Sequence, residues 1–156
     1  MGRITDDSFG ELELEEDYDR WLRNYEIVIF SRKHKVVLIV EGNDDESQIY
    51  IEQRNAFDLL EGDKDSIIHE LEKSLFAYYQ SEAARAPELF EGLPIVYSTE
   101  ELSQLLKLRW IRFPIVYDKG EILFGFLFDC SWDPEHGVAA RYDNKALSIG
   151  QQDILP

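Results

Sequence analysis

The chain has 156 residues, 44% of them hydrophobic, which is enough to bury a core and argues against a disordered chain, so we expect a single domain over residues 1–156. It carries 32 acidic and 16 basic side chains, a net charge of −16, and a surface of this sign repels nucleic acid and anionic lipid. No apolar run reaches the roughly 18 residues of a membrane span, and the N-terminus has no apolar region of a signal peptide, so we expect a cytoplasmic protein without a membrane partner.

The acidic side chains are concentrated toward the N-terminus. Residues 6–19 contain eight carboxylates and no basic residue, and a second acidic stretch, EGNDDE, covers residues 41–46. From residue 10 to residue 16 the acids alternate with Leu12 and Leu14. This alternation predicts a β-strand with one acidic, solvated face and one buried face.

Two further strands are predicted before residue 41. Residues 21–30 are rich in β-formers, with Tyr25, Ile27 and Ile29 on one face, and residues 36–40 form a continuous β-branched run typical of a central strand. The polar segment SRKHK, residues 31–35, is expected to be the turn between them. The N-terminal part is therefore predicted to be a three-stranded antiparallel meander.

The middle of the chain has the pattern of helices. Residues 49–60 have mixed helical spacing, although Tyr50 and Ile51 would also extend a strand. Asp63 or Asp65 is placed to cap a second helix over residues 64–85. Its predicted buried stripe consists of Ile67, Ile68, Leu71, Leu75, Tyr78 and Tyr79.

The last third returns to strands. Ser98 and Glu101 form a capping box before a short helix whose inner face is Leu102, Leu105 and Leu106. The turn sequences DKG, DPEHG and DN then separate successive apolar runs, which predicts a second antiparallel meander. Gly125 inside one of these strands indicates a bulge or a close backbone approach. The predicted fold class is therefore α+β: an N-terminal antiparallel meander, central helices and a C-terminal antiparallel meander.

The segment LFDCSWDPEHGVAARY, residues 127–142, contains side chains that could take part in catalysis or bind a metal. Cys130 is the only cysteine, which excludes an internal disulfide and a multi-cysteine metal site. Nucleophilic catalysis would require Cys130 and His136 to lie within hydrogen-bond reach. Asp133, Glu135 and His136 offer metal ligands, but they lack the spacing of a preformed zinc or calcium site.

A structural interpretation of the same segment is a tight turn. Asp133 can cap the turn, Pro134 fixes one φ angle, and Gly137 supplies a positive one. Trp132 is then expected to anchor the turn to the sheet, and Cys130 to be buried as a small hydrophobic residue. We favour this interpretation over catalysis or metal binding.

The order of several features resembles a poorly characterised bacterial family of domains of unknown function. The features are Trp21, the pair Tyr78-Tyr79, the Cys-x-Trp-Asp-x-Glu-His-Gly pattern of residues 130–137, and the closing Gly-x-Gln-Asp of residues 150–153. The resemblance covers nearly the whole chain, but the heavy N-terminal acid is not part of it. It implies a relationship to immunity proteins proposed to act beside polymorphic toxins, and it implies no catalytic residues.

Charge and resemblance together predict a non-catalytic, acidic binding protein rather than an enzyme. Its expected form is a bacterial immunity protein that neutralises a basic, nuclease-type toxin by blocking its active site or substrate cleft. The alternatives are a small enzyme or metal-binding protein that uses the Cys130–His136 hairpin, and a regulatory subunit unrelated to toxins. No nucleotide-binding, metalloprotease or hydrolase motif is present, so no cofactor is expected. The predicted partner-binding residues are two acidic clusters and the hairpin tip: Glu11, Glu13, Glu15, Glu16, Asp17, Asp19, Asp44, Asp45, Glu46, Asp133, Glu135 and His136.

Overall fold

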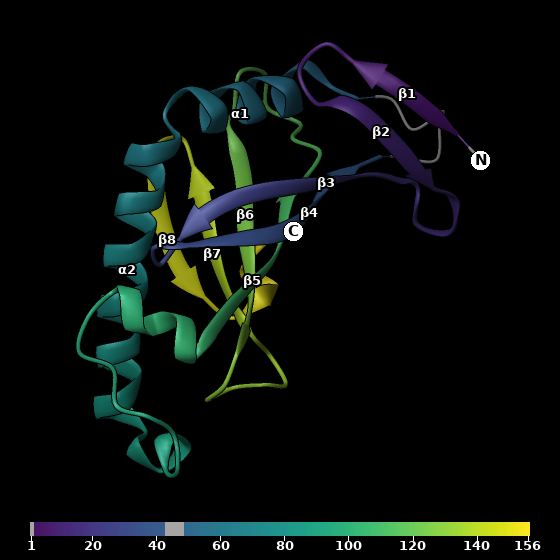
Figure 1. Cartoon of the computed structure of the whole chain (residues 1–156). Helices are drawn as coiled ribbons and strands as arrows, with labels where there is room; N and C mark the ends of the chain where they lie inside the picture. Colours follow the sequence, from purple (N-terminus) through teal and green to yellow (C-terminus); the bar gives the residue numbers. More distant parts are fainter. Residues whose placement is uncertain (1, 43–48) are drawn as a thin grey trace.

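The computed structural model describes residues 2–42 and 49–156, and these residues form strands, two long helices and short 3₁₀ turns (Figure 1). The strands are β1 (Arg3–Asp6), β2 (Gly10–Glu15), β3 (Arg20–Ile29), β4 (Arg32–Glu41), β5 (Leu106–Phe113), β6 (Leu123–Cys130), β7 (Val138–Asp143) and β8 (Ala146–Gly150). The helices are α1 (Ile51–Gly62) and α2 (Lys64–Arg85), and the 3₁₀ turns are η1 (Glu16–Tyr18), η2 (Pro87–Phe90), η3 (Glu100–Gln104) and η4 (Gln152–Ile154).

The eight strands form one sheet in which the spatial order is the chain order, β1 to β8. All neighbouring strands are antiparallel except β4 and β5, which run parallel. The predicted α+β class is therefore confirmed, and the two predicted meanders are joined edge to edge through this parallel pair. The N-terminal meander has four strands rather than three, because the short strand β1, which lacks an apolar run, pairs with β2.

The turn predicted over residues 31–35 is wrong. Only Phe30 and Ser31 form the β3–β4 turn, with φ angles of 56° and 59°, and Arg32 already pairs with Ile29. Two positive φ angles match the twist of a two-residue hairpin. The residues from Arg32 to Lys35 lack an apolar signal because this part of the hairpin is largely exposed.

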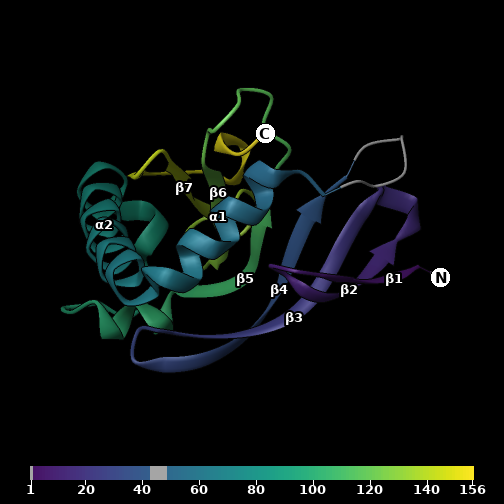
Figure 2. The same cartoon turned by 90° about the horizontal axis from the view of Figure 1, so that it is seen from above.

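The two helices lie together on one face of the sheet, and the sheet curves around them (Figure 2). The predicted stripe of α2 is buried, except that Tyr78 is only partly covered. In α1 the buried apolar residues are Ala56, Phe57 and Leu60. The curvature brings Phe30, at the tip of the β3–β4 hairpin, within 6.3 Å of Phe128 on β6, measured between ring centroids. The main core therefore lies between the helices and the concave face of the sheet.

The start of α1 is fixed to the ends of the two parallel strands by one buried amide. Gln53 is 1% exposed, and its Nε2 donates to the Glu41 carbonyl at 2.8 Å and to the Phe113 carbonyl at 3.0 Å. Its Oε1 accepts the Tyr50 N–H at 2.9 Å. One side chain thus satisfies three backbone groups at the point where β4 and β5 end and α1 begins.

The opposite face of β6 and β7 is covered by the C-terminal segment. Leu155 packs with Leu123, Leu127 and Ala139 in a small second core. A Cβ added at Gly125 would overlap the Leu155 side chain, so Gly125 admits a neighbouring side chain rather than the predicted bulge or backbone approach.

The predicted short helix after Ser98 differs in detail. It is the 3₁₀ turn η3, and Leu106, expected on its inner face, is the first residue of β5. The Ser98 hydroxyl does accept the Glu101 N–H, at 3.4 Å, as a capping box requires. Leu102, Leu105 and Leu106 are all buried, so the apolar pattern was correct although the element ends earlier.

Replacing Gln53 with leucine should lower the free energy of unfolding by about 2–4 kcal/mol, because buried backbone groups then lose their partners. Urea unfolding measures the change. Asn55→Leu, an exposed amide on the same helix, is the matched control and should alter stability little. Equal effects of the two substitutions would contradict the role assigned to Gln53.

Candidate binding surfaces

The acidic residues of β2 lie on a projecting hairpin, here called the acidic arm and comprising residues 3–20. Glu11 and Glu13 point to solvent while Leu12 is 1% exposed, so the predicted alternation is confirmed. The arm lies at the edge of the molecule remote from α2 (Figure 1). In the same arm, Tyr18 is 65% exposed, and the Arg20 guanidinium lies 4.7 Å from the centroid of its ring.

The carboxylates of the arm are not equivalent. Glu15 pairs with Arg20 at 2.7 Å, and Glu11 lies 3.5 Å from Arg3. The described part of the chain contains no ion pair of Glu13 or of the exposed Asp17. These two are the carboxylates most available to a partner. Of the other predicted cluster members, the Glu16 side chain and the residues Asp44, Asp45 and Glu46 lie outside the described residues, and Asp19 is partly covered.

The acidic arm is held to α1 by a buried carboxylate that the sequence analysis did not single out. Asp6 is 6% exposed and accepts the Ser8 and Phe9 N–H groups at 3.0 Å each and Arg54 Nε at 2.7 Å. Next to it, Phe9 stacks on Phe57 of α1 with ring centroids 4.8 Å apart. The sequence gives no signal for a contact between residues 6 and 54, because it depends on how the arm folds back onto the helix.

The environment of Asp6 has two opposing effects on its pKa. Burial alone would raise the pKa, but the hydrogen bonds from Phe9, Arg54 and Ser8 outweigh it and lower the pKa below the ordinary value of 3.8. The ionised form is therefore the one that holds the arm in place.

The predicted hairpin tip forms a capped turn. Asp133 accepts the His136 N–H at 3.3 Å and lies 3.0 Å from His136 Nδ1, and Gln151 donates to its other oxygen at 3.2 Å. Gly137 has a φ angle of 64°, as predicted. Asp133 is thus occupied within the turn, whereas Glu135 and His136 are exposed and accessible to a partner.

Cys130 is not placed for catalysis with His136. The thiol is 2% exposed, and burial raises its pKa to about 12, so it is protonated at neutral pH. The His136 ring contacts Asp133 instead, and this hydrogen bond raises the pKa of His136. Within residues 2–42 and 49–156 no group of three or more His, Cys, Asp or Glu side chains is arranged to hold a metal ion.

The ring contacts of Trp132 join the hairpin to the helical layer, whereas the prediction named only the sheet. Its ring stacks on Phe90 with centroids 5.1 Å apart and meets the edge of Tyr79 at 5.8 Å, and Tyr78 lies 6.4 Å away. This aromatic cluster joins the Tyr78-Tyr79 pair to the hairpin, two features that are separated by more than fifty residues in the sequence. Both features therefore have a packing role.

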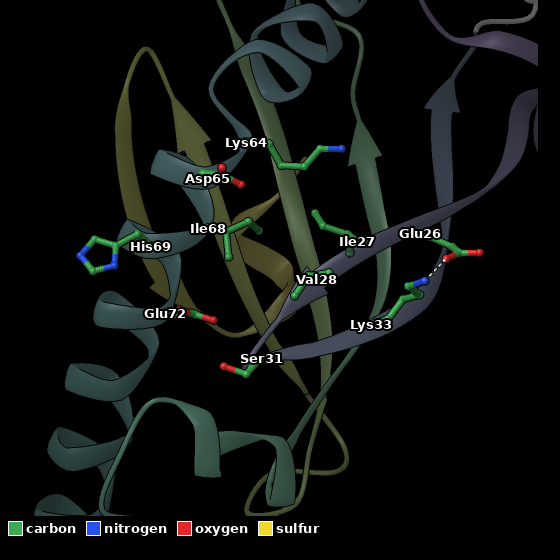
Figure 3. Close-up of a pocket in the computed structure, with 10 residues that line it drawn as sticks. All are labelled: Glu26, Ile27, Val28, Ser31, Lys33, Lys64, Asp65, Ile68, His69 and Glu72. Carbon is green, nitrogen blue, oxygen red and sulfur yellow. Dashed lines mark ion pairs between the residues drawn. The ribbon is translucent and has the colours of Figure 1, made fainter.

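A cleft of about 420 Å³ lies between the β3–β4 hairpin and the first turns of α2 (Figure 3). Its walls carry both signs of charge, and several of these groups are already paired. Lys33 lies 3.6 Å from Glu26, and Glu72 accepts the Phe30 N–H at 2.6 Å. Because the polar groups do not converge on one point, the cleft offers no site for a small ligand of defined charge.

These features define an acidic α+β domain with a projecting carboxylate-bearing arm. A family model described as "Domain of unknown function (DUF6985)" matches residues 8–156, and the chain belongs to this family. No curated protein and no solved structure gave a match. No helix in the described part of the chain is both long enough and apolar enough to cross a membrane.

Asp6→Asn should destabilise the fold by about 1–3 kcal/mol at pH 7, because the charged hydrogen bonds are lost. The pKa of Asp6 is lower in the folded than in the unfolded protein. The stabilisation by Asp6 is therefore complete above its unfolded-state pKa and is lost as the pH falls through its folded-state pKa. The difference between wild type and variant should therefore shrink below about pH 4. Urea unfolding at several pH values measures it. The exposed neighbour Asp7 provides the control Asp7→Asn, and a constant difference at all pH values would contradict the account.

Asp133→Asn should lower the pKa of His136, since the hydrogen bond to Asp133 is the largest cause of its elevation. NMR titration of the imidazole protons measures this shift. His34 serves as an internal reference, because burial lowers its pKa and it lies outside the hairpin of residues 130–137. Glu135→Gln should produce a smaller change, and a shift as large as that of Asp133→Asn would mean that general charge rather than the hydrogen bond sets the His136 pKa.

Proposed function

We propose that this protein is a non-catalytic binding protein whose acidic arm docks on a basic protein. In its concrete form it is a bacterial immunity protein that neutralises a cognate, nuclease-type toxin by occupying the active site or the cleft for nucleic acid. Glu11, Glu13, Asp17 and Tyr18 form the predicted centre of the contact. Glu135 and His136 are a weaker second contact.

The observation that carries the proposal is the arrangement of the acidic arm. Glu13 and Asp17 are exposed carboxylates without an ion pair in the described chain, and Tyr18, which follows Asp17 directly, is 65% exposed. Unpaired carboxylates favour lysine and arginine on a partner, and tyrosine is a frequent contributor of binding energy at protein interfaces. A nuclease must present cations to phosphate, so its substrate cleft is complementary to this surface.

The charge of the whole molecule supports the same partner. Residues 51–104, which include both helices, carry twelve acidic and four basic side chains. The acidic excess therefore extends well beyond the arm. Such a field accelerates the encounter with a basic protein and repels nucleic acid, which would otherwise compete for the same partner.

The enzymatic alternative receives no support from the hairpin, because Cys130 is buried and protonated and, within the described residues, forms no hydrogen bond with His136. A regulatory subunit that binds a basic partner would use the same surface. The two binding functions differ in what the partner does when it is alone. Co-expression with the products of neighbouring reading frames distinguishes them, because only an immunity function rescues cells from a toxic partner.

The double variant Glu13→Lys/Asp17→Lys should slow association with the neutralised toxin about tenfold and reduce protection of cells that express it. Surface plasmon resonance at several salt concentrations measures the rate, and the variant should also show a weaker salt dependence.

The matched control is Asp118→Lys/Asp153→Lys, which changes the net charge equally at exposed positions outside the acidic arm. It should slow association less. If both double variants slow association equally, total charge rather than the arm governs encounter, and the proposed docking surface is wrong.

A further inference from the structure

The segment between α2 and β5 exposes an unusual set of apolar side chains. Ile95 is 66% exposed and Tyr97 is 76% exposed, and between them Val96 is 4% exposed. Because alternate residues of an extended segment point to opposite sides, Ile95 and Tyr97 lie on one side with Val96 anchored beneath them. Leu89, earlier in the same segment, is 45% exposed. We call residues 87–101 the presenting loop.

Hydrogen bonds and ring packing hold the presenting loop in place. The Val96 N–H donates to the buried hydroxyl of Tyr79 at 3.0 Å, and the Tyr97 N–H donates to Glu101 at 3.2 Å. Phe90 stacks on Trp132 in the aromatic cluster described above. The loop is therefore preorganised, and presenting its apolar side chains to a partner costs little conformational entropy.

All charged side chains of the presenting loop are acidic. No basic residue occurs between Arg85 and Lys107, whereas Glu88 and Glu91 are both exposed in this interval. Arg85 itself is paired with Glu82 at 2.8 Å. At the other end of the loop, Arg32 of β4 lines a depression together with Glu100 and Glu101. The excess of negative charge is therefore clearest at the end that carries Glu88 and Glu91.

A second exposed isoleucine and tyrosine provide a comparison within the same molecule. Ile51 is 57% exposed and Tyr117 is 92% exposed, and their segments are neighbours because the Gly120 N–H donates to Glu52 at 3.4 Å. Tyr117 is followed by both Asp118 and Lys119, so this pair has neither the acid-only surroundings nor the buried aromatic support. It is a natural control.

We propose that the presenting loop is a second docking surface, whose occupant is a basic protein segment that carries an aromatic or large aliphatic side chain. The apolar side chain packs on Ile95 and Tyr97, and flanking lysines or arginines pair with Glu88 and Glu91. The inference rests on the proposed function for the biological partner, and it adds the site at which that partner is anchored. In Figure 1 the loop lies at the end of α2, remote from the acidic arm, so the two surfaces contact different parts of a partner.

The probe that tests the site is a synthetic peptide in which lysines flank one tryptophan. Added to the ¹⁵N-labelled protein, it should shift the amide signals of residues 87–101. The double variant Ile95→Ser/Tyr97→Ala should weaken binding about tenfold or more, while Ile51→Ser/Tyr117→Ala should leave the affinity unchanged. Glu88→Lys/Glu91→Lys should also weaken binding.

Three outcomes would overturn the proposal. The first is the absence of shifts in residues 87–101, and the second is equal loss of affinity in the Ile95/Tyr97 and Ile51/Tyr117 variants. The third is equal affinity for an all-lysine peptide, which would remove the apolar anchor. All variants change exposed side chains, and far-ultraviolet circular dichroism verifies that they remain folded.

The test separates this inference from the proposed function. If a neighbouring toxin is neutralised as well by Ile95→Ser/Tyr97→Ala as by the wild type, the immunity function stands and the presenting loop is wrong. If no neighbouring product is toxic, the immunity function fails, and the peptide titration still decides whether the loop binds basic aromatic segments.

Discussion

The parallel pairing of β4 with β5 is the constraint on which the rest of the structure depends. Two parallel neighbours cannot be joined by a hairpin, so the chain must cross from one end of the sheet to the other. The connection carries α1, α2 and the presenting loop, and it places both helices on one face of the sheet. Gln53 closes this arrangement by satisfying the carbonyls at the ends of both strands. The opposite face of β6 and β7 is left to the C-terminal segment.

The Tyr78-Tyr79 pair and the hairpin of residues 130–137, which the sequence pattern singled out, serve the scaffold. Tyr79 and Trp132 meet in one aromatic cluster, and the Tyr79 hydroxyl holds the backbone at Val96. The family match covers these segments and begins at residue 8, after β1. Ile95 and Tyr97, on either side of Val96, are mostly exposed and belong to neither core cluster of the described residues. The presenting loop is held by hydrogen bonds and yet exposes apolar side chains to water. Binding of a partner explains this exposure better than a role in folding does.

The sequence predicted elements whose signal is local and failed where the fold depends on distant pairings. The acid–leucine alternation of β2 and the apolar stripe of α2 are periodic patterns, and both were correct. The Arg32–Lys35 part of β4 was mistaken for a turn, because a strand that leaves the core carries no apolar residues. The parallel β4–β5 pair, the Asp6–Arg54 contact and the support of Val96 by Tyr79 join residues that are 73, 48 and 17 positions apart. Neither composition nor periodicity encodes such pairings.

The net negative charge attracts a basic partner, but it does not determine the position at which the partner docks. At physiological ionic strength charges are screened over about 8 Å, so most of the 32 carboxylates act only on the approach. The docking position depends on short-range groups, namely exposed aromatic or aliphatic side chains next to unpaired carboxylates. In the described chain this combination occurs at Tyr18 beside Asp17 and at the presenting loop near Glu91. Tyr117, the most exposed tyrosine of the described chain, also has a cation two positions away, but Lys119 has no ion pair in the described residues, whereas Arg20 beside Tyr18 is already paired with Glu15.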